Sequence, residues 1–398
     1  MKSSFFNRGN RYHTINSIAQ NIIKLHEFSE VPSSPTANHE PIYPLFVAFA
    51  YYLMNNKWFA VALLQSIINI INGIIIYYIA KIVLNNKIIS LISMFLVLFY
   101  PYYIVSCNSV CDTIVFCFFL ALSIYLIILS CRNQNFWAIL ACGCCWGLTL
   151  LTRFSAISIF CFALIYFFMN LPYSRAIKSS IIILFGCLLI LIPWLYRNYI
   201  LTGKFFVTTR GAIEIWFGYN DDSFEIINNN ISVDKMRKDL DEKVPSLKGV
   251  RQRNYHSSIF KEIEEYKIFI NEAIAFIINN PWQSFKMMPI KFMKFWSWNF
   301  NPIPFPRSTE SFLFKIRRIV YTISYLPILL LGILGIWLTR YCWRTHSIFL
   351  LIFIGYSVMH TIIYGFTRLR VPIDQFLIIY AAYSIFYYMK KLNIISIS

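Results

Sequence analysis

The chain has 398 residues; 58% are hydrophobic, 18% are aromatic and only 14% are charged. This charged fraction lies well below the roughly 25% of ordinary soluble domains, and apolar stretches of about 20 residues, enough to span a bilayer core, recur along the chain. The composition therefore excludes a soluble globular protein and predicts an integral membrane protein. The net charge of +18 does not indicate nucleic-acid binding, because the basic residues gather at span ends and in one long loop, where they face lipid headgroups.

The first predicted segment, residues 1–56, has no continuous apolar core of the kind found in a cleavable signal peptide. Residues 29–41, SEVPSSPTANHEP, have the Ser and Pro content of a loop. Residues 42–54, IYPLFVAFAYYLM, are apolar but short for a span. We expect an outer-face loop followed by an interfacial helix.

Nine further apolar stretches predict transmembrane helices, with one polar segment between the sixth and the seventh. The spans lie at about 57–83, 87–105, 112–131, 136–152, 154–170, 177–196, 318–340, 346–365 and 371–389. The predicted fold class is an all-α polytopic membrane protein, with a transmembrane core at 57–196, an extramembrane loop domain at 197–316 and C-terminal helices at 317–398. The later half of the loop domain has the periodicity of an amphipathic helix.

Basic residues in the short loops predict the orientation, because cytoplasmic loops carry an excess of Lys and Arg. One side of the predicted bundle holds Lys81, Lys87, Arg132, Arg175, Lys178, Arg340, Arg344, Lys390 and Lys391. This side is expected to be cytoplasmic. The long loop, the N-terminal segment, Asp112, Arg153 and the pair Arg368 and Arg370 then lie on the outer, extracytoplasmic face.

The ten cysteines do not predict a disulfide framework or a metal site. Most lie in apolar stretches, where a thiol packs as a small hydrophobe. The run CGCC at 142–145 does not bring its thiols to one helix face, and no His or carboxylate lies near it. No metal and no cofactor are predicted.

Asp112 is the first candidate functional residue. Outside the long loop the carboxylates are Glu27, Glu30, Glu40, Asp112 and Asp374. An ionisable group at the mouth of a membrane helix is costly unless it faces water, a partner or a substrate. Asp112 therefore either caps the helix that follows it or faces a functional cavity, and the two roles are compatible.

Four arginines on the same expected face are candidates for binding phosphate. In GFTRLRVPIDQF (365–376), Pro372 disfavours helix at the residue before it, so we expect an extended segment in which Arg368 and Arg370 project to one side. Two adjacent guanidiniums suit phosphate oxygens, although both side chains can instead reach lipid headgroups. Arg153 in GLTLLTRFS and Arg197 in PWLYRN add to this cationic face.

The order of these motifs resembles that of the polyprenyl-phosphate-dependent glycosyltransferases of the GT-C superfamily, closest to the branch of protein O-mannosyltransferases and aminoarabinose transferases (glycosyltransferase family 39). The similar stretches run in order from residue 16 onward. They are FSEVPSSPTANHEPIYPLFVAFAYYL, LVLFYPYYIVSCNSVCDTIVFCFFLALSIYL, GLTLLTRFSAI, PWLYRNYILTGKFFVTTRGAIEIWFGYN and RLRVPIDQFLIIYAAY. The resemblance implies a GT-C-like bundle and an enzyme that transfers a sugar, with inversion, from a lipid-linked donor.

The resemblance also implies roles for residues. Asp112 matches the acid of the second outer loop, and Arg368 and Arg370 match positions beside the donor phosphate. The family's first transmembrane helix and the outer-loop Asp after it, normally the general base, have no counterpart here, and Phe154 stands where the family has Pro. Glu40 is the nearest carboxylate that can substitute as base, with His39 as a weaker alternative.

Three functions remain open from the sequence. The first is a membrane glycosyltransferase that uses a polyprenyl-phosphate sugar and a glycan, lipid or protein acceptor on the extracytoplasmic face. The second is a catalytically degenerate relative that binds the lipid-linked sugar. The third is a transporter or flippase, which the absence of an internal repeat disfavours.

Overall fold

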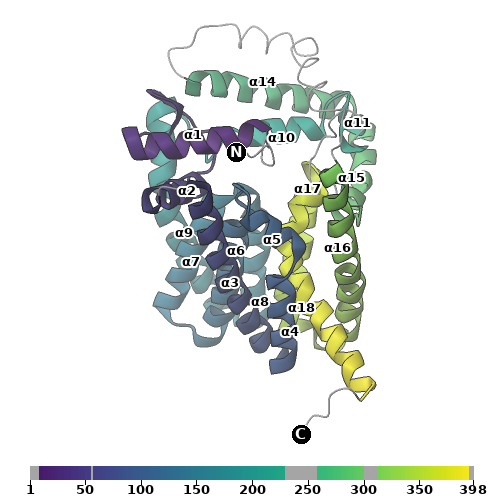
Figure 1. The fold of residues 1–398 in the computed structure, drawn as a ribbon. Helices are drawn as coiled ribbons and strands as arrows, with labels where there is room; N and C mark the ends of the chain where they lie inside the picture. Colours follow the sequence, from purple (N-terminus) through teal and green to yellow (C-terminus); the bar gives the residue numbers. More distant parts are fainter. Residues whose placement is uncertain (1–8, 55–56, 229–257, 300–311, 394–398) are drawn as a thin grey trace. The chain divides into compact units, whose positions relative to one another are not determined.

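The computed structural model describes residues 9–54, 57–228, 258–299 and 312–393, most of which are helical (Figure 1). The all-α fold class is confirmed. The chain divides into two compact units. Unit 1 comprises Met1–Lys57, Pro193–Arg318 and Ser357–Leu369, and unit 2 comprises Trp58–Ile192, Ile319–Tyr356 and Arg370–Ser398. The expected loop-domain segments 229–257 and 300–311 lie outside the described residues.

Unit 1 is built from helices of 6 to 22 residues and one small antiparallel sheet. It contains α1 (Gly9–Leu25), β1 (Ser29–Val31), β2 (Ser34–Pro35), α2 (Ile42–Leu53), α10 (Gly211–Gly218), α11 (Ser223–Asn228), α14 (Ser258–Asn279) and α15 (Pro281–Trp296). The helix expected at 42–54 is present as α2, and its place at a membrane surface stays a prediction. The amphipathic helix expected in the long loop is present as α14.

Two packed pairs of helices organise unit 1 (Figure 1). α1, which the sequence analysis did not expect, lies beside α2 and buries Ile15, Ile18 and Ala19. Their spacing of three and four residues places them on one helix face. α10 packs against α14, where Trp216 and Phe269 belong to one apolar cluster. The local pattern of apolar residues therefore decides which face of each helix is buried.

Unit 2 is a bundle of mostly apolar helices. It contains α3 (Lys57–Leu84), α4 (Lys87–Leu98), α5 (Pro101–Cys107), α6 (Thr113–Asn133), α7 (Phe136–Thr152), η2 (Phe154–Ala156), α8 (Ile157–Asn170), η3 (Arg340–Cys342) and most of α9 (Tyr173–Thr202), α16 (Phe312–Leu338), α17 (Trp343–Ile362) and α18 (Thr367–Lys391).

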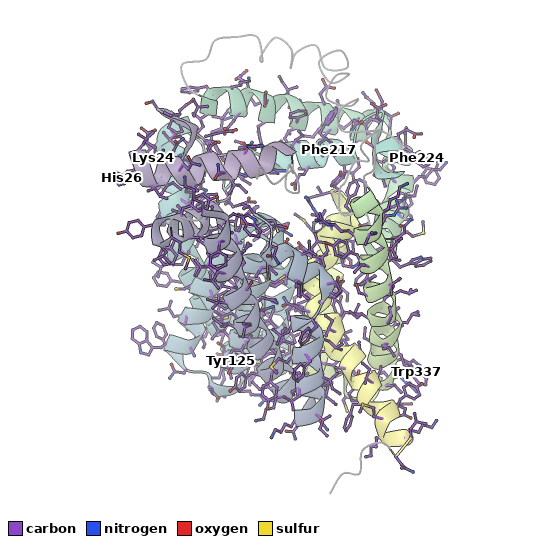
Figure 2. The ribbon with its side chains drawn as sticks, in the orientation of Figure 1. Lys24, His26, Tyr125, Phe217, Phe224 and Trp337 are labelled. Carbon is purple, nitrogen blue, oxygen red and sulfur yellow. The ribbon has the colours of Figure 1, made fainter. Side chains whose placement is uncertain are left out.

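The described residues contain helices at all nine expected span positions. By length and composition, six of them can cross a membrane, and a seventh is added if α4 and α5, which meet at a bend of 50°, form one span. α7 and the stretch Phe154–Asn170 are shorter apolar helices. Large apolar side chains also point outward, as Trp337 of α16 does with 56% of its surface exposed (Figure 2). The chain is an integral, multi-pass membrane protein.

Glycines at 143 and 186 let two helices of unit 2 approach closely. A Cβ at Gly143 of α7 would lie 2.4 Å from the Ile183 carbonyl oxygen of α9, and a Cβ at Gly186 would lie 2.6 Å from the Leu140 oxygen. Small residues at such crossings are typical of membrane helices. The glycine of CGCC therefore has a packing role, and the thiols of Cys142, Cys144 and Cys145 are not in disulfides.

Lys291 of α15 lies in the interior of unit 1. Its side chain has no exposed surface; Nζ lies 3.5 Å from the centre of the Tyr219 ring and donates a hydrogen bond to the Ile362 carbonyl oxygen at 3.3 Å. Burial lowers the pKa of Lys291 to about 7, because the charged ammonium is disfavoured away from water.

This lysine predicts a pH-dependent stability. An unfolded lysine has a pKa of about 10.4, so between about pH 7 and pH 10 the unfolded chain binds more protons than the folded chain, and stability rises with pH. We expect the unfolding temperature of the detergent-solubilised protein to rise across this window, and the rise to be smaller in Lys291→Met. Lys286→Met, which changes an exposed lysine of the same helix, keeps the wild-type slope. Equal slopes in wild type and Lys291→Met would contradict the assignment.

Candidate functional site

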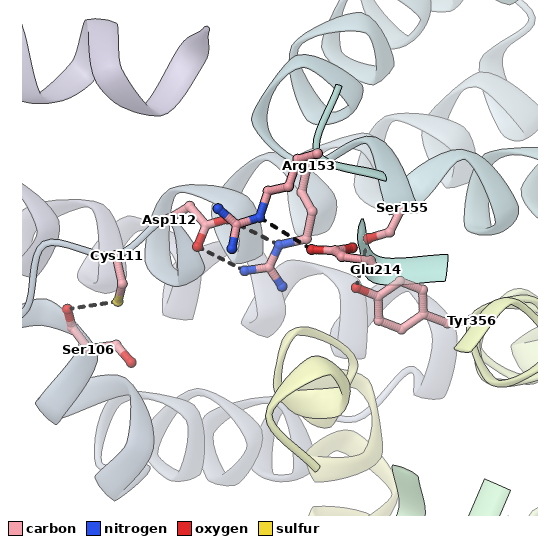
Figure 3. A network of polar contacts seen from close by, with 8 residues as sticks. Ser106, Cys111, Asp112, Arg153, Ser155, Glu214 and Tyr356 are labelled. Carbon is pink, nitrogen blue, oxygen red and sulfur yellow. Dashed lines mark hydrogen bonds and ion pairs between the residues drawn. The ribbon is translucent and has the colours of Figure 1, made fainter. Parts of the chain in front are cut away.

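Asp112 and Arg153 form an ion pair in unit 2. Arg153 Nη2 donates to Asp112 Oδ1 at 2.9 Å, and Nε donates to Oδ2 at 3.2 Å, so both carboxylate oxygens face the guanidinium (Figure 3). The two side chains are 6% and 16% exposed, respectively. A two-point contact of this kind fixes geometry as well as charge.

The chain path explains how two residues 41 positions apart meet. Asp112 is the residue before α6, and Arg153 is the residue after α7. The two helices lie side by side and are joined by Gln134 and Asn135, so the start of α6 and the end of α7 lie at the same end of the pair. Asp112 occupies the N-cap position expected from the sequence, but its side chain makes no capping hydrogen bond. The carboxylate is instead directed to Arg153.

Aromatic and hydroxyl groups complete the surroundings of Arg153. Its guanidinium carbon lies 4.8 Å from the centre of the Phe116 ring. The hydroxyl of Tyr356 accepts a hydrogen bond from the guanidinium and lies 3.4 Å from Ser155 Oγ (Figure 3). The site thus combines one carboxylate, one cation and two hydroxyls beside an aromatic ring. This set provides a group that accepts a proton and a group that binds an anion.

The prediction of an extended segment before Pro372 was wrong. α18 begins at Thr367 and contains Pro372 within the helix. Residues two apart on a helix do not share a face, so Arg368 and Arg370 do not project to one side. The preference of the residue before proline for extended backbone is overcome here by contacts of α18, including an ion pair from Arg370 to Asp374, four residues on.

Arg370 lies in a buried polar cluster of unit 2. Its Nε donates to Asp374 Oδ1 at 3.0 Å, and neither side chain has exposed surface. The Tyr100 hydroxyl donates to Asp374 Oδ2 at 3.1 Å, and the Tyr325 ring centre lies 3.5 Å from the guanidinium carbon. Asp374 was not predicted as the partner of Arg370, although their spacing of four residues is that of a helical ion pair.

Arg197 and Arg368 belong to unit 1. Arg197 Nη1 donates to the Thr36 carbonyl oxygen at 2.8 Å, Nη2 donates to that of Phe28 at 3.1 Å, and the guanidinium carbon lies 4.7 Å from the Trp194 ring centre. These contacts hold the N-terminal segment. Arg368 is half-buried in the first turn of α18.

Glu40, the candidate base, lies in unit 1 between this segment and α2. It is half-buried, and the neighbouring His39 is buried. The segment before it is anchored by Glu262 of α14, whose carboxylate accepts hydrogen bonds from the Thr36 hydroxyl and the Ala37 N–H. Burial raises the pKa of Glu262, and the two hydrogen bonds oppose this shift.

Of the candidate site residues, Asp112 and Arg153 are in contact with each other within one unit. Among the described residues, no three His, Cys, Asp or Glu side chains are grouped to hold a metal ion.

The Asp112–Arg153 pair predicts coupled effects on stability. Removing one partner deprives the other, largely buried charge of this ion pair, so Asp112→Asn and Arg153→Met each lower the unfolding temperature. The double variant is expected to lose less than the sum, with a coupling of about 0.5–3 kcal/mol. Thermal unfolding in detergent measures this coupling. Arg132→Met, which changes an exposed residue at the other end of α6, is the control. Strictly additive losses would show that the pair does not act as a unit.

Comparison with known proteins gives a match to a family model and a likeness to a solved structure. Residues 38–196 match the family model described as dolichyl-phosphate-mannose-protein mannosyltransferase. No curated protein matches the chain. The crystal structure of ArnT from Cupriavidus metallidurans bound to undecaprenyl phosphate aligns with a TM-score of 0.41 and 10% identity, over 96% of this chain and 75% of that one. The family match includes Glu40, Asp112 and Arg153, and it supports the resemblance that the order of the motifs indicated.

Proposed function

We propose that the protein is a membrane glycosyltransferase that moves a sugar, with inversion, from a polyprenyl-phosphate donor to an acceptor on the extracytoplasmic face. The observation that carries the proposal is the Asp112–Arg153 pair, a carboxylate and a guanidinium in contact inside the segment that matches the family model. The family is named for dolichyl-phosphate mannose, which is a sugar on a polyprenyl phosphate.

The chemistry needs an anion-binding group and a base. The acceptor hydroxyl attacks the anomeric carbon, the bond from that carbon to the phosphate oxygen breaks, and the polyprenyl phosphate leaves with the bonding electrons. A guanidinium aimed at the oxygen where this charge develops lowers the barrier. Arg153 has this role in the proposal, and Arg368 of unit 1 stays a predicted phosphate-binding residue.

A carboxylate takes the proton of the acceptor hydroxyl. Asp112 and Glu40 are the candidates in the matched segment. Since both oxygens of Asp112 bind Arg153 in the structure, a donor phosphate competes with Asp112 for the guanidinium. Donor binding and the release of the carboxylate are then one event. We propose supporting roles for Arg197, which holds backbone carbonyls, and Arg370, which holds Asp374.

The second candidate function is a relative that binds the lipid-linked sugar without transferring it. The same observation favours it, because a carboxylate engaged at both oxygens serves structure as well as chemistry. The two functions differ in turnover and share donor binding.

The test uses the purified 398-residue chain in lipid nanodiscs with a panel of radiolabelled polyprenyl-phosphate sugars, mannose first. Solubilised membrane extract supplies acceptors, and the release of polyprenyl phosphate is followed. We expect release by the wild type and a loss of about 10²-fold or more in Arg153→Met and in Asp112→Asn. Arg132→Met, at the opposite end of α6, is expected to keep wild-type turnover.

Two other results decide against transfer. Saturable donor binding that is weakened by Arg153→Met, with no release of polyprenyl phosphate, establishes the binding function instead. If the protein binds no donor of the panel and releases no polyprenyl phosphate from any of them, both candidate functions are overturned.

A further inference from the structure

Gln65 of α3 reaches from its helix to the segment that precedes Asp112. Its side-chain Nε2 donates to the carbonyl oxygens of Ser109 and Cys107 at 2.9 Å and lies 3.3 Å from that of Ser106. The Gln65 side chain has no exposed surface. All of these residues belong to unit 2. One buried amide therefore binds three carbonyl groups of a single backbone turn more than 40 positions away in the chain.

The carbonyl groups of Ser106 and Cys107 belong to the last turn of α5, and that of Ser109 lies just beyond its end. α5 ends at Cys107, and the last carbonyls of a helix have no partner within it. The chain then folds back on the same groups, since the N–H of Ser109 donates to the Ser106 oxygen at 3.1 Å and the N–H of Cys111 donates to the Ser109 oxygen at 2.8 Å. Cys111 Sγ lies 3.8 Å from the Ser106 oxygen (Figure 3). Gln65 thus holds the atoms around which the 106–111 turn is built.

Asp112 follows this turn directly. Its carbonyl oxygen accepts the N–H of Phe116 at 2.9 Å, which fixes its backbone to α6 on one side. On the other side its backbone is attached to Cys111. Because its side chain makes no capping hydrogen bond, the place of the carboxylate opposite Arg153 depends on the course of the turn.

We propose that Gln65 is a positioning residue for Asp112: by binding the carbonyls of the 106–111 turn, it places the Asp112 carboxylate against Arg153. The consequence for sugar transfer rests on the proposed function, whereas the consequence for the turn does not.

Asn69, one helical turn further along α3, provides the matched comparison. It is also a buried amide, 6% exposed, and its Oδ1 has no hydrogen-bond partner among the described residues. No hydrogen bond joins Asn69 to the 106–111 turn in the part of the chain that the structure describes. If any change of a buried amide on α3 disturbs the protein, substitutions at Gln65 and at Asn69 have the same effect. If Gln65 positions the turn, only the substitution at Gln65 disturbs it.

The first test is the reactivity of Cys111, the residue beside Asp112. Gln65→Met keeps the length of the side chain and removes the donor. We expect maleimide to label Cys111 several-fold faster in Gln65→Met than in wild type or Asn69→Leu, with site-by-site mass spectrometry as the readout. The exposed Cys161 and Cys342 report the labelling rate that the turn does not affect. Gln65→Asn, which draws the amide back by one methylene, carries the same test if Gln65→Met lowers the folded yield.

Unchanged Cys111 labelling in folded Gln65→Met and Gln65→Asn would overturn the proposal. The second readout is the release of polyprenyl phosphate, for which we expect Gln65→Met to lower kcat by up to about 10²-fold while the KM for the donor changes little. Asn69→Leu leaves both parameters near wild type. Faster Cys111 labelling together with a wild type that releases no polyprenyl phosphate sustains the positioning role and counts against the proposed function alone.

Discussion

A charge among apolar helices is tolerated when an opposite charge lies beside it, and unit 2 meets this constraint at two places. Asp112 is paired with Arg153, and Arg370 is paired with Asp374. The first pair is formed by residues that flank two neighbouring helices, so it ties the start of α6 to the end of α7. The second lies within α18 and is closed by tyrosines from α16 and from the α4–α5 bend. The pairs differ in exposure. Arg370 and Asp374 are fully enclosed, whereas Arg153 keeps 16% of its side chain accessible.

Much of this arrangement is visible in the sequence, and the limits have physical causes. Composition and apolar stretches predicted the fold class and helices at nine positions, because a membrane span is a local property of about 20 residues. Asp112 and Arg153 were each expected at a site on chemical grounds. Their contact was not, since it depends on how α6 and α7 pack. The prediction of an extended segment before Pro372 was wrong because it used only the preference of the residue before proline. It did not include the helical ion pair that the spacing of Arg370 and Asp374 indicates. Gln65 was not predicted as a functional residue, because no residue near it in the sequence shows which groups its amide binds.

The polar residues of α3 form a pattern that is visible in the sequence. Gln65, Asn69 and Asn72 recur at helical spacing in an otherwise apolar helix and are all buried. Gln65 binds the turn before Asp112, and Asn72 Nδ2 donates to Gln375 Oε1 of α18. Amides inside a membrane bundle can satisfy backbone or side-chain groups without the cost of a full charge. The stripe therefore indicates which helices α3 contacts through polar groups, before any ion pair is considered.

If α7 spans the bilayer, as its sequence predicted, its shortness has a consequence for the surrounding lipid. Its 17 residues extend about 26 Å at 1.5 Å per residue, which is less than the roughly 30 Å of a hydrocarbon core. Such a hydrophobic mismatch is relieved when the bilayer thins locally or when flanking side chains extend to the interface. Arg153 stands at the end of this short helix. Local thinning there brings lipid headgroups nearer to the depth of its guanidinium.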